Sequence, residues 1–222
     1  MKGKFFVIDG MDGTGKTEQT DELIKRMQRE GFPVDTISFP RYGKPAAAAV
    51  GEYLEKYKKG SEFGPMTEVS AKQASIFYAI DRFGARRGMI ATLDAGTHLV
   101  ANRYVASNMG HQGSKIDDLA ERMSFYHWND KLEFSLYGVP RPDLNIILHV
   151  PVDVALTRID SRGLEKDAHE NRAHLEAAER TYFEIARTFP GFCLIEGVED
   201  GRILSIPEVH EKIWKVVRPL LD

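Results

Sequence analysis

Short apolar runs alternate with longer amphipathic segments along most of the chain. Five runs have strand length and are rich in Val, Ile, Leu and Phe: KFFVIDG (4–10), VDTISFP (34–40), THLVANR (97–103), LNIILHV (144–150) and FCLIEG (192–197). Apolar strands separated by helices are typical of βαβ units around a parallel sheet. The pattern predicts a three-layer α/β fold, with a five-stranded parallel sheet flanked by helices.

The segments between these runs carry apolar residues at helical spacing. In the segment 16–32, Leu23 and Met27 share one face, and Gly31 and Pro33 end the helix. Similar spacing predicts helices over 45–59, 67–96, 116–136, 152–162, 170–189 and 207–221. No repeat or Pro/Gly/Ser-rich linker divides the sequence, so we expect one domain over residues 1–222.

One stretch, about 158–171, stands apart because it is dense in charge and poor in apolar residues. Such a composition suits a short mobile lid over a site, and a solvated helix surface explains it equally well.

Composition limits the partners and the compartment. The formal charge is −3 and the isoelectric point about 6.2, which favours neither nucleic acid nor an anionic membrane as a partner. The single cysteine, Cys193, cannot form an intramolecular disulfide and is expected to be a buried apolar residue. No run of about 18 apolar residues occurs, so the sequence predicts a cytoplasmic protein.

The stretch GMDGTGKT (10–17) matches the pattern GxxxxGK[ST] between the first strand and the first helix. Glycines let successive N–H groups point at phosphate oxygens, and the helix N-terminus adds positive potential. Lys16 is expected to reach the β and γ phosphates of ATP, and the Thr17 hydroxyl to bind Mg²⁺. The residues predicted to bind the nucleotide are Gly10, Gly13, Thr14, Gly15, Lys16 and Thr17.

This motif alone leaves the phosphoryl acceptor open. A GTPase would carry an NKxD motif, and a motor ATPase an acid at the end of a buried strand; the sequence shows neither. The remaining class is kinases of small acceptors, which need a second anion site facing the first.

Three later stretches could supply that site. SFPRYG (38–43) follows the second strand at the carboxyl edge, where α/β proteins bind ligands. Tyr78 and Arg82 share one helix face, although packing plus a surface arginine also explains that pair. Arg103 directly follows a buried strand, which suits bidentate phosphate binding. The residues that follow could contact the sugar and base: Ser107, Asn108, His111 and Gln112.

In this order, GMDGTGKT, FPRYG, FYAIDR, RYVASN and the charged DAHE segment resemble the thymidylate kinases over essentially the whole chain. The resemblance implies transfer of the ATP γ-phosphoryl to dTMP, giving dTDP for dTTP synthesis, in a homodimer that uses Mg²⁺. It also implies roles for individual residues. Asp12 would contact the 3′-hydroxyl, Tyr78 would stack on thymine, Arg82 would bind the base edge, and Arg103 would hold the acceptor phosphate. The other residues that would face dTMP are Phe39, Arg41, Tyr42, Ser107, Asn108 and Gln112.

Two positions distinguish this chain from other members of the family. Some thymidylate kinases carry a catalytic arginine at the position of Gly13; here glycine leaves the lid as its source, with Arg162 favoured over Arg158. The family usually has aspartate where this chain has Asn102, and Asp9 is the candidate within the sheet to replace it near Mg²⁺. The lid acids Asp167 and Glu170 are alternatives.

Other functions stay open at this stage. A kinase for another nucleoside monophosphate would share everything except the base pocket, and a P-loop ATPase or switch would share the first motif. A homologue that binds nucleotides without catalysis is a third possibility, because of Asn102.

Overall fold

A five-stranded parallel sheet forms the centre of the computed structural model, which describes residues 2–55, 62–66, 68–161 and 172–221. Its order is β2-β3-β1-β4-β5, and every neighbouring pair is parallel. The five predicted strands are confirmed as β1 (Phe5–Asp9), β2 (Val34–Ser38), β3 (His98–Asn102), β4 (Leu144–His149) and β5 (Phe192–Glu196).

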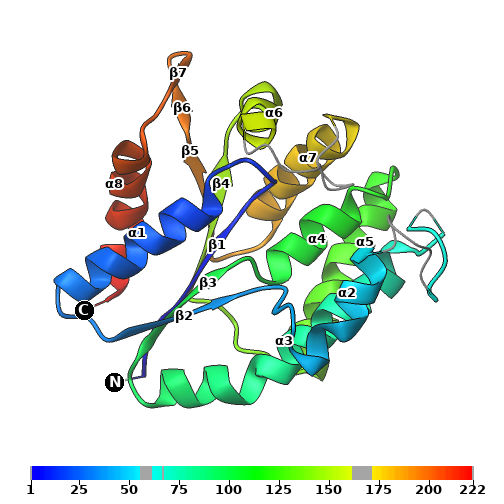
Figure 1. Ribbon diagram of the computed structural model, residues 1–222, viewed down its shortest axis with the longest axis horizontal. Coiled ribbons are helices and arrows are strands. Elements are labelled where there is room, and N and C mark those ends of the chain that lie inside the picture. The colour runs from blue at the N-terminus through cyan, green and yellow to red at the C-terminus, as the bar shows by residue number, and fades with distance from the viewer. Residues whose placement is uncertain (1, 56–61, 67, 162–171, 222) are drawn as a thin grey trace.

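Both faces of the sheet are buried, which explains the nearly continuous apolar runs. Along β1, Phe6 and Ile8 pack with α1 (Lys16–Arg29) and α8 (Ile206–Val217) on one face. Phe5 and Val7 point the other way, into a core shared with α3 (Ala71–Asp94), α4 (Val105–Gly113) and α5 (Leu119–Asp130). Figure 1 shows α1 and α8 on one side of the sheet and α3, α4, α5 and α7 (Arg172–Thr188) on the other. The three-layer α/β prediction is confirmed.

Most predicted helices form within a few residues of the expected bounds. α1 ends before Gly31, α6 spans Val152–Ser161, and α7 lies inside the segment 170–189. α8 begins at Ile206, one residue before the predicted segment 207–221. The segment 45–59 is a 3₁₀ turn (Pro45–Ala47) followed by α2 (Ala48–Glu55), and residues 56–59 lie outside the described part. α3 begins later than predicted, because a capping box at Ser70 and Gln73 fixes its start.

Three elements were not predicted. α4 was missed because it is buried on nearly every side and so shows no amphipathic pattern. The two-residue strands β6 (Val198–Glu199) and β7 (Arg202–Ile203) are too short and polar to show alternation. The end of the predicted helix 116–136 is a π-helical turn, Lys131–Leu136.

Of the predicted lid, residues 158–161 form the last turn of α6, and 162–171 lie outside the described residues. Among the described helices, none combines the length and apolar character that a membrane crossing requires.

Candidate active site

The glycine-rich loop joins β1 to α1 at the carboxyl edge of the sheet. Gly13 has φ 81°, and a Cβ atom built there would lie 2.5 Å from the backbone oxygen of Ala155. No side chain fits at this position without moving the backbone. Gly15 caps α1 with φ 90°, so the first N–H groups of the helix face the space enclosed by the loop.

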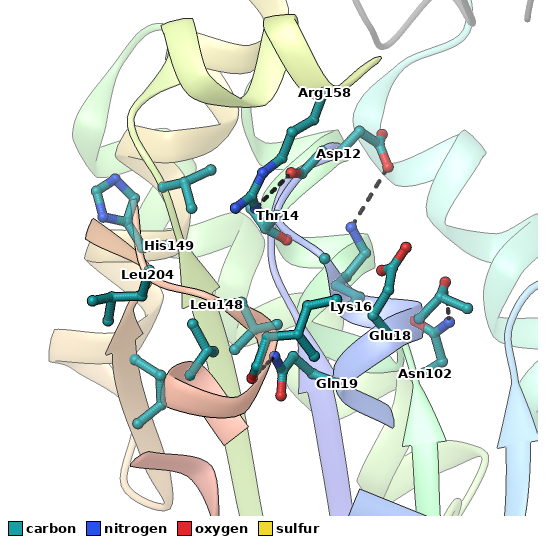
Figure 2. A pocket seen from close by; sticks show the side chains of 18 of the residues that line it. Asp12, Thr14, Lys16, Glu18, Gln19, Asn102, Leu148, His149, Arg158 and Leu204 are labelled. Atoms are coloured by element: carbon teal, nitrogen blue, oxygen red, sulfur yellow. Dashed lines mark hydrogen bonds and ion pairs between the residues drawn. The ribbon is translucent and has the colours of Figure 1, made fainter. Parts of the chain in front are cut away.

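A cavity of about 580 Å³ opens over this loop, and its lining has a polar and an apolar end. Figure 2 shows Lys16, Asp12, Asn102 and Arg158 around the loop, with Leu148 and Leu204 further along. The polar end suits phosphates and the apolar end suits a flat base, so we call it the donor cavity. The other apolar residues that line it are Val150, Ile195, Ile206 and Val209.

Lys16 is buried in the donor cavity beside two charged groups. Its Nζ donates to the backbone oxygen of Met11 at 2.7 Å and lies 3.6 Å from Asp12 Oδ1. Burial and then the charge of Arg103 lower the pKa of Lys16 to about 8, while Asp12 acts in the opposite direction. An anionic ligand in the donor cavity would stabilise the charged form of Lys16, because the Coulomb attraction would offset the hydration that the ammonium loses on burial.

A second cavity, of about 240 Å³, lies beside the first and is called the acceptor cavity. Asp12 and Arg103 line both cavities, so a group in one can meet a group in the other at these two side chains. Most residues expected to face the acceptor line it: Phe39, Tyr42, Tyr78, Arg82, Arg103, Ser107, Asn108 and Gln112. Arg41 does not line it.

Arg103 occupies this junction through a constrained turn between β3 and α4. Its φ is 65°, in the left-handed region, and its N–H donates to the oxygen of Ile8 at 2.9 Å. A non-glycine residue in this region carries strain that the surroundings must support. Its side chain donates to Asp12 from Nη2, which ties it to the glycine-rich loop.

Asp9 supplies much of that support. Its carboxylate is fully buried and accepts from the N–H of Tyr104 at 3.1 Å, the N–H of Ser107 at 2.9 Å and the hydroxyl of Tyr182 at 2.9 Å. The Ser107 hydroxyl and the Gly10 N–H also donate to it. These hydrogen bonds occupy both oxygens, and Asp9 does not line the donor cavity. These hydrogen bonds make Asp9 the anchor of the β3–α4 turn, and its binding of the metal stays a prediction.

Two arginines expected at the acceptor are held by carboxylates. Arg82 is 2% exposed and pairs through Nε and Nη2 with the buried Glu133 of the π-helical turn. It still lines the cavity, with Nη1 nearest Tyr104 O at 3.4 Å. Arg41 donates from its N–H, Nε and Nη2 to Asp81, which explains its absence from the cavity wall.

Thr17 and Asn102 face each other at the edge of the donor cavity. Asn102 Nδ2 donates to Thr17 Oγ1 at 3.2 Å, and among the described residues Asn102 Oδ1 is buried without a hydrogen-bond partner. Arg158 Nη1 approaches the oxygen of Gly13 at 3.4 Å. Arg162, Asp167 and Glu170 lie outside the described residues.

Comparison with known proteins decides the family. The family model described as thymidylate kinase matches residues 8–213, which includes both cavities. The chain belongs to the thymidylate kinase family. This family uses ATP as the phosphoryl donor and phosphorylates dTMP to dTDP.

Individual thymidylate kinases support the same placement. The enzyme of Mycobacterium tuberculosis is 30% identical over 217 residues, covering 91% of this chain and 97% of its own. That of Idiomarina loihiensis is 25% identical and covers both chains completely. The solved structure of thymidylate kinase from Candida albicans has a TM-score of 0.75 at 19% identity, covering 98% of this chain and 92% of its own, which shows the shared fold.

Sequence reasoning missed the residues that hold other site residues in place. Glu133 and Tyr182 contact no expected ligand group, yet they fix Arg82 and Asp9. Glu133 lies in a stretch predicted as an ordinary helix, and Tyr182 follows the helical spacing of α7, so neither carried a signal. Only the fold brings them within hydrogen-bond distance of motif residues.

Proposed function

We propose that this chain transfers the γ-phosphoryl group of ATP to the phosphate of dTMP, giving ADP and dTDP. The observation that carries the proposal is the meeting of two cavities at Asp12 and Arg103. One has the loop that binds a triphosphate, and the other has the charge and aromatic rings that a nucleoside monophosphate needs.

The donor cavity would hold ATP through the residues of the glycine-rich loop. Backbone N–H groups from Gly13 to Thr17 would bind the phosphates, and Lys16 would neutralise the β and γ oxygens. The apolar end, with Leu148 and Leu204, would hold the base. Because no side chain fits at Gly13, the catalytic arginine would come from Arg158 or Arg162.

The residues near Thr17 fit Mg²⁺. The Thr17 hydroxyl and the unpartnered Asn102 Oδ1, buried among the described residues, are neutral oxygen donors. Mg²⁺ prefers oxygen ligands and usually keeps waters and substrate phosphates rather than an all-protein cage. Thr17 would hold it directly and Asn102 would orient that hydroxyl. When bound, Mg²⁺ neutralises charge on the β and γ phosphates.

The acceptor phosphate would bind Arg103 at the junction. Its second pKa is about 6, so it is mostly dianionic at pH 7 and attacks without a general base. Catalysis is then positioning and charge neutralisation: Arg103 aligns the attacking oxygen, and Lys16 with the lid arginine stabilises the transferring phosphoryl. Asp12 would release part of its hold on Arg103 and contact the 3′-hydroxyl.

Thymine would lie against the wall built by α3 and α4. Tyr78 offers a ring for stacking, and Arg82, fixed by Glu133, offers Nη1 toward a carbonyl oxygen of the base. The side-chain oxygens of Asn108 and Gln112 are buried without hydrogen-bond partners among the described residues, so they could accept from the ring N–H. Phe39, Tyr42 and Ser107 would complete the enclosure.

We also propose that the enzyme is a cytoplasmic homodimer. On α3, Ile76, Ile80 and Phe83 are spaced four and three residues apart and are 37%, 38% and 51% exposed. An exposed apolar stripe on a helix is typical of an interface. The single half-buried cysteine suits a reducing compartment.

A coupled assay of ADP release across nucleoside monophosphates tests the proposal. We expect turnover with dTMP to exceed that with dUMP, UMP and dCMP, and little ATP hydrolysis without an acceptor. The variants Arg158→Ala and Arg162→Ala identify the lid arginine, because loss of a transition-state arginine costs on the order of 10³ in rate. Equal ATP hydrolysis with and without dTMP would exclude the kinase function.

A further inference from the structure

Two histidines stand behind Arg103 and are not part of the phosphate chemistry described above. His111 lies in the last turn of α4 and His174 in the first turn of α7. Arg103 Nη1 is 3.1 Å from His111 Nε2, and His111 Nδ1 is 3.1 Å from His174 Nε2. The rings are stacked, with an interplanar angle of 7° and centroids 5.4 Å apart.

Arg103 fixes the direction of each hydrogen bond in the series from Arg103 through His111 to His174. A guanidinium only donates, so His111 Nε2 must accept and carry no proton. A neutral His111 then has its proton on Nδ1 and donates to His174 Nε2. His174 in turn holds its proton on Nδ1, 3.5 Å from the hydroxyl of Ser114. That hydroxyl donates to His111 O at 2.8 Å and so has a lone pair to accept with.

This series of hydrogen bonds restrains the guanidinium of Arg103. Nη2 of Arg103 is bound to Asp12, and Nη1 has Ser107 Oγ at 3.5 Å and His111 at 3.1 Å. His111 is therefore the shorter contact on the side of the guanidinium away from Asp12. It is 8% exposed, and the edge of Tyr182 meets its ring at 90°, so it has little freedom to turn.

We propose that His111 and His174 form a relay of positioning residues that holds Arg103 in place for the acceptor phosphate. His111 accepts from Arg103, and His174 selects the tautomer of His111 that can accept. The relay links the beginning of α7, directly after residues 162–171, to the arginine at the junction of the cavities. It rests on the proposed function for its effect on dTMP, whereas the tautomer is a property of the protein alone.

The first test measures the tautomer directly. In long-range ¹H–¹⁵N spectra of the ¹⁵N-labelled protein at pH 8, we expect His111 to be neutral with its proton on Nδ1. His111→Phe and His174→Phe assign the signals. A proton on Nε2 of His111, or on both nitrogens, would overturn the proposal. This result does not depend on the chain being a dTMP kinase.

The second test separates positioning from packing. His174→Phe keeps the stacked ring and removes the acceptor for His111 Nδ1, so we expect the KM for dTMP to rise about three- to tenfold, the usual range for one hydrogen bond. The KM for ATP should stay the same. His127→Phe, on the exposed side of α5, is the matched control and should change neither constant.

A rescue completes the test. We expect His111→Phe to raise the KM for dTMP, because Arg103 loses its acceptor. His111→Gln places an amide oxygen within reach of Arg103 and does not depend on His174 to fix a tautomer, so its KM for dTMP should be close to that of the unaltered chain. In the His111→Gln background, His174→Phe should have no further effect, because the amide oxygen accepts from Arg103 whatever residue stands at position 174. Equal and additive losses in both backgrounds would show that the rings serve packing alone, and the relay would be rejected.

Discussion

The charge state of Lys16 makes ATP binding sensitive to pH. Burial and Arg103 lower its pKa to about 8 in the free protein, and the phosphates of ATP will raise it. The bound form therefore holds more protons, so ATP affinity should fall as pH rises through 8. Calorimetric titrations in buffers of different ionisation enthalpy should detect uptake of about half a proton per ATP at pH 8.

Lys16→Arg is the control for that measurement. A guanidinium stays charged throughout this range, so its variant should bind ATP without the proton uptake. Uptake of the same size in Lys16→Arg would assign the proton to another group.

Asn102 is expected to weaken the response to Mg²⁺. Its Nδ2 donates to Thr17 Oγ1 at 3.2 Å, which uses a lone pair of the hydroxyl that would bind the metal. In Asn102→Asp the carboxylate would accept from that hydroxyl instead and add negative charge. The Mg²⁺ concentration for half-maximal turnover should fall on the order of tenfold, the scale of effect of groups that orient metal ligands.

Asn102→Ala, which removes the donor without adding charge, is the comparison for this effect. ATP binding measured with and without Mg²⁺ gives a readout apart from turnover. If Asn102→Asp leaves the Mg²⁺ dependence unchanged, the amide at position 102 does not weaken Mg²⁺ binding.

For single residues, the sequence predicted well which side chains line the site. It predicted poorly which partners hold those side chains in place. The spacing in GxxxxGK[ST] and the position of Arg103 after a strand directly reflect local backbone geometry, and both lie at the cavities. The partners of Asp9 and Arg82 come from residues 98 and 51 positions away. No local pattern contains that information, so the sequence did not predict that Asp9 holds the β3–α4 turn.

Among the elements, α4 and α7 are held together by close packing at Gly110. A Cβ atom there would lie 2.8 Å from Cζ of Tyr182, and Thr181 Oγ1 donates to Gly110 O at 2.9 Å. Gly110→Ala should destabilise the protein by about 1–3 kcal/mol, the usual cost of overpacking a core. It should also raise the KM for dTMP, because Tyr182 anchors Asp9 and through it the Arg103 turn.

Gly88 provides the matched substitution. It lies in α3 with nothing within 4 Å of a built Cβ atom. Gly88→Ala should therefore stabilise the protein by about 0.5–1 kcal/mol through helix propensity. Urea unfolding at constant m-value measures both changes, and shifts of the same sign would contradict this account of the α4–α7 contact.

Elements were predictable where one face is buried and one is exposed. α1 shows this well, since Leu23 and Met27 lie on its buried face and charged residues on the other. α4 is buried on nearly all sides because α3, α5 and α7 pack around it. Its polar residues line the acceptor cavity, so the segment shows no amphipathic pattern and no helix was predicted there.

At the scale of the whole molecule, the site and the proposed dimer interface share α3. Tyr78 and Arg82 line the acceptor cavity, while Ile76, Ile80 and Phe83 are exposed on the same helix. A partner packed on that stripe would restrain α3, so association should favour acceptor binding. The stability of the dimer and the affinity for dTMP are then linked.

Ile80→Lys tests this link. A charge in the middle of an apolar interface is costly to bury, so the variant should sediment as a monomer where the unaltered chain sediments as a dimer. Its KM for dTMP should rise while its KM for ATP changes little, because the donor cavity is built from other elements. Gln28→Lys adds the same charge on the exposed face of α1 and should leave both mass and KM unchanged. Sedimentation of the unaltered chain as a monomer at all concentrations would reject the dimer, and a monomeric variant with unaltered KM would reject the link through α3.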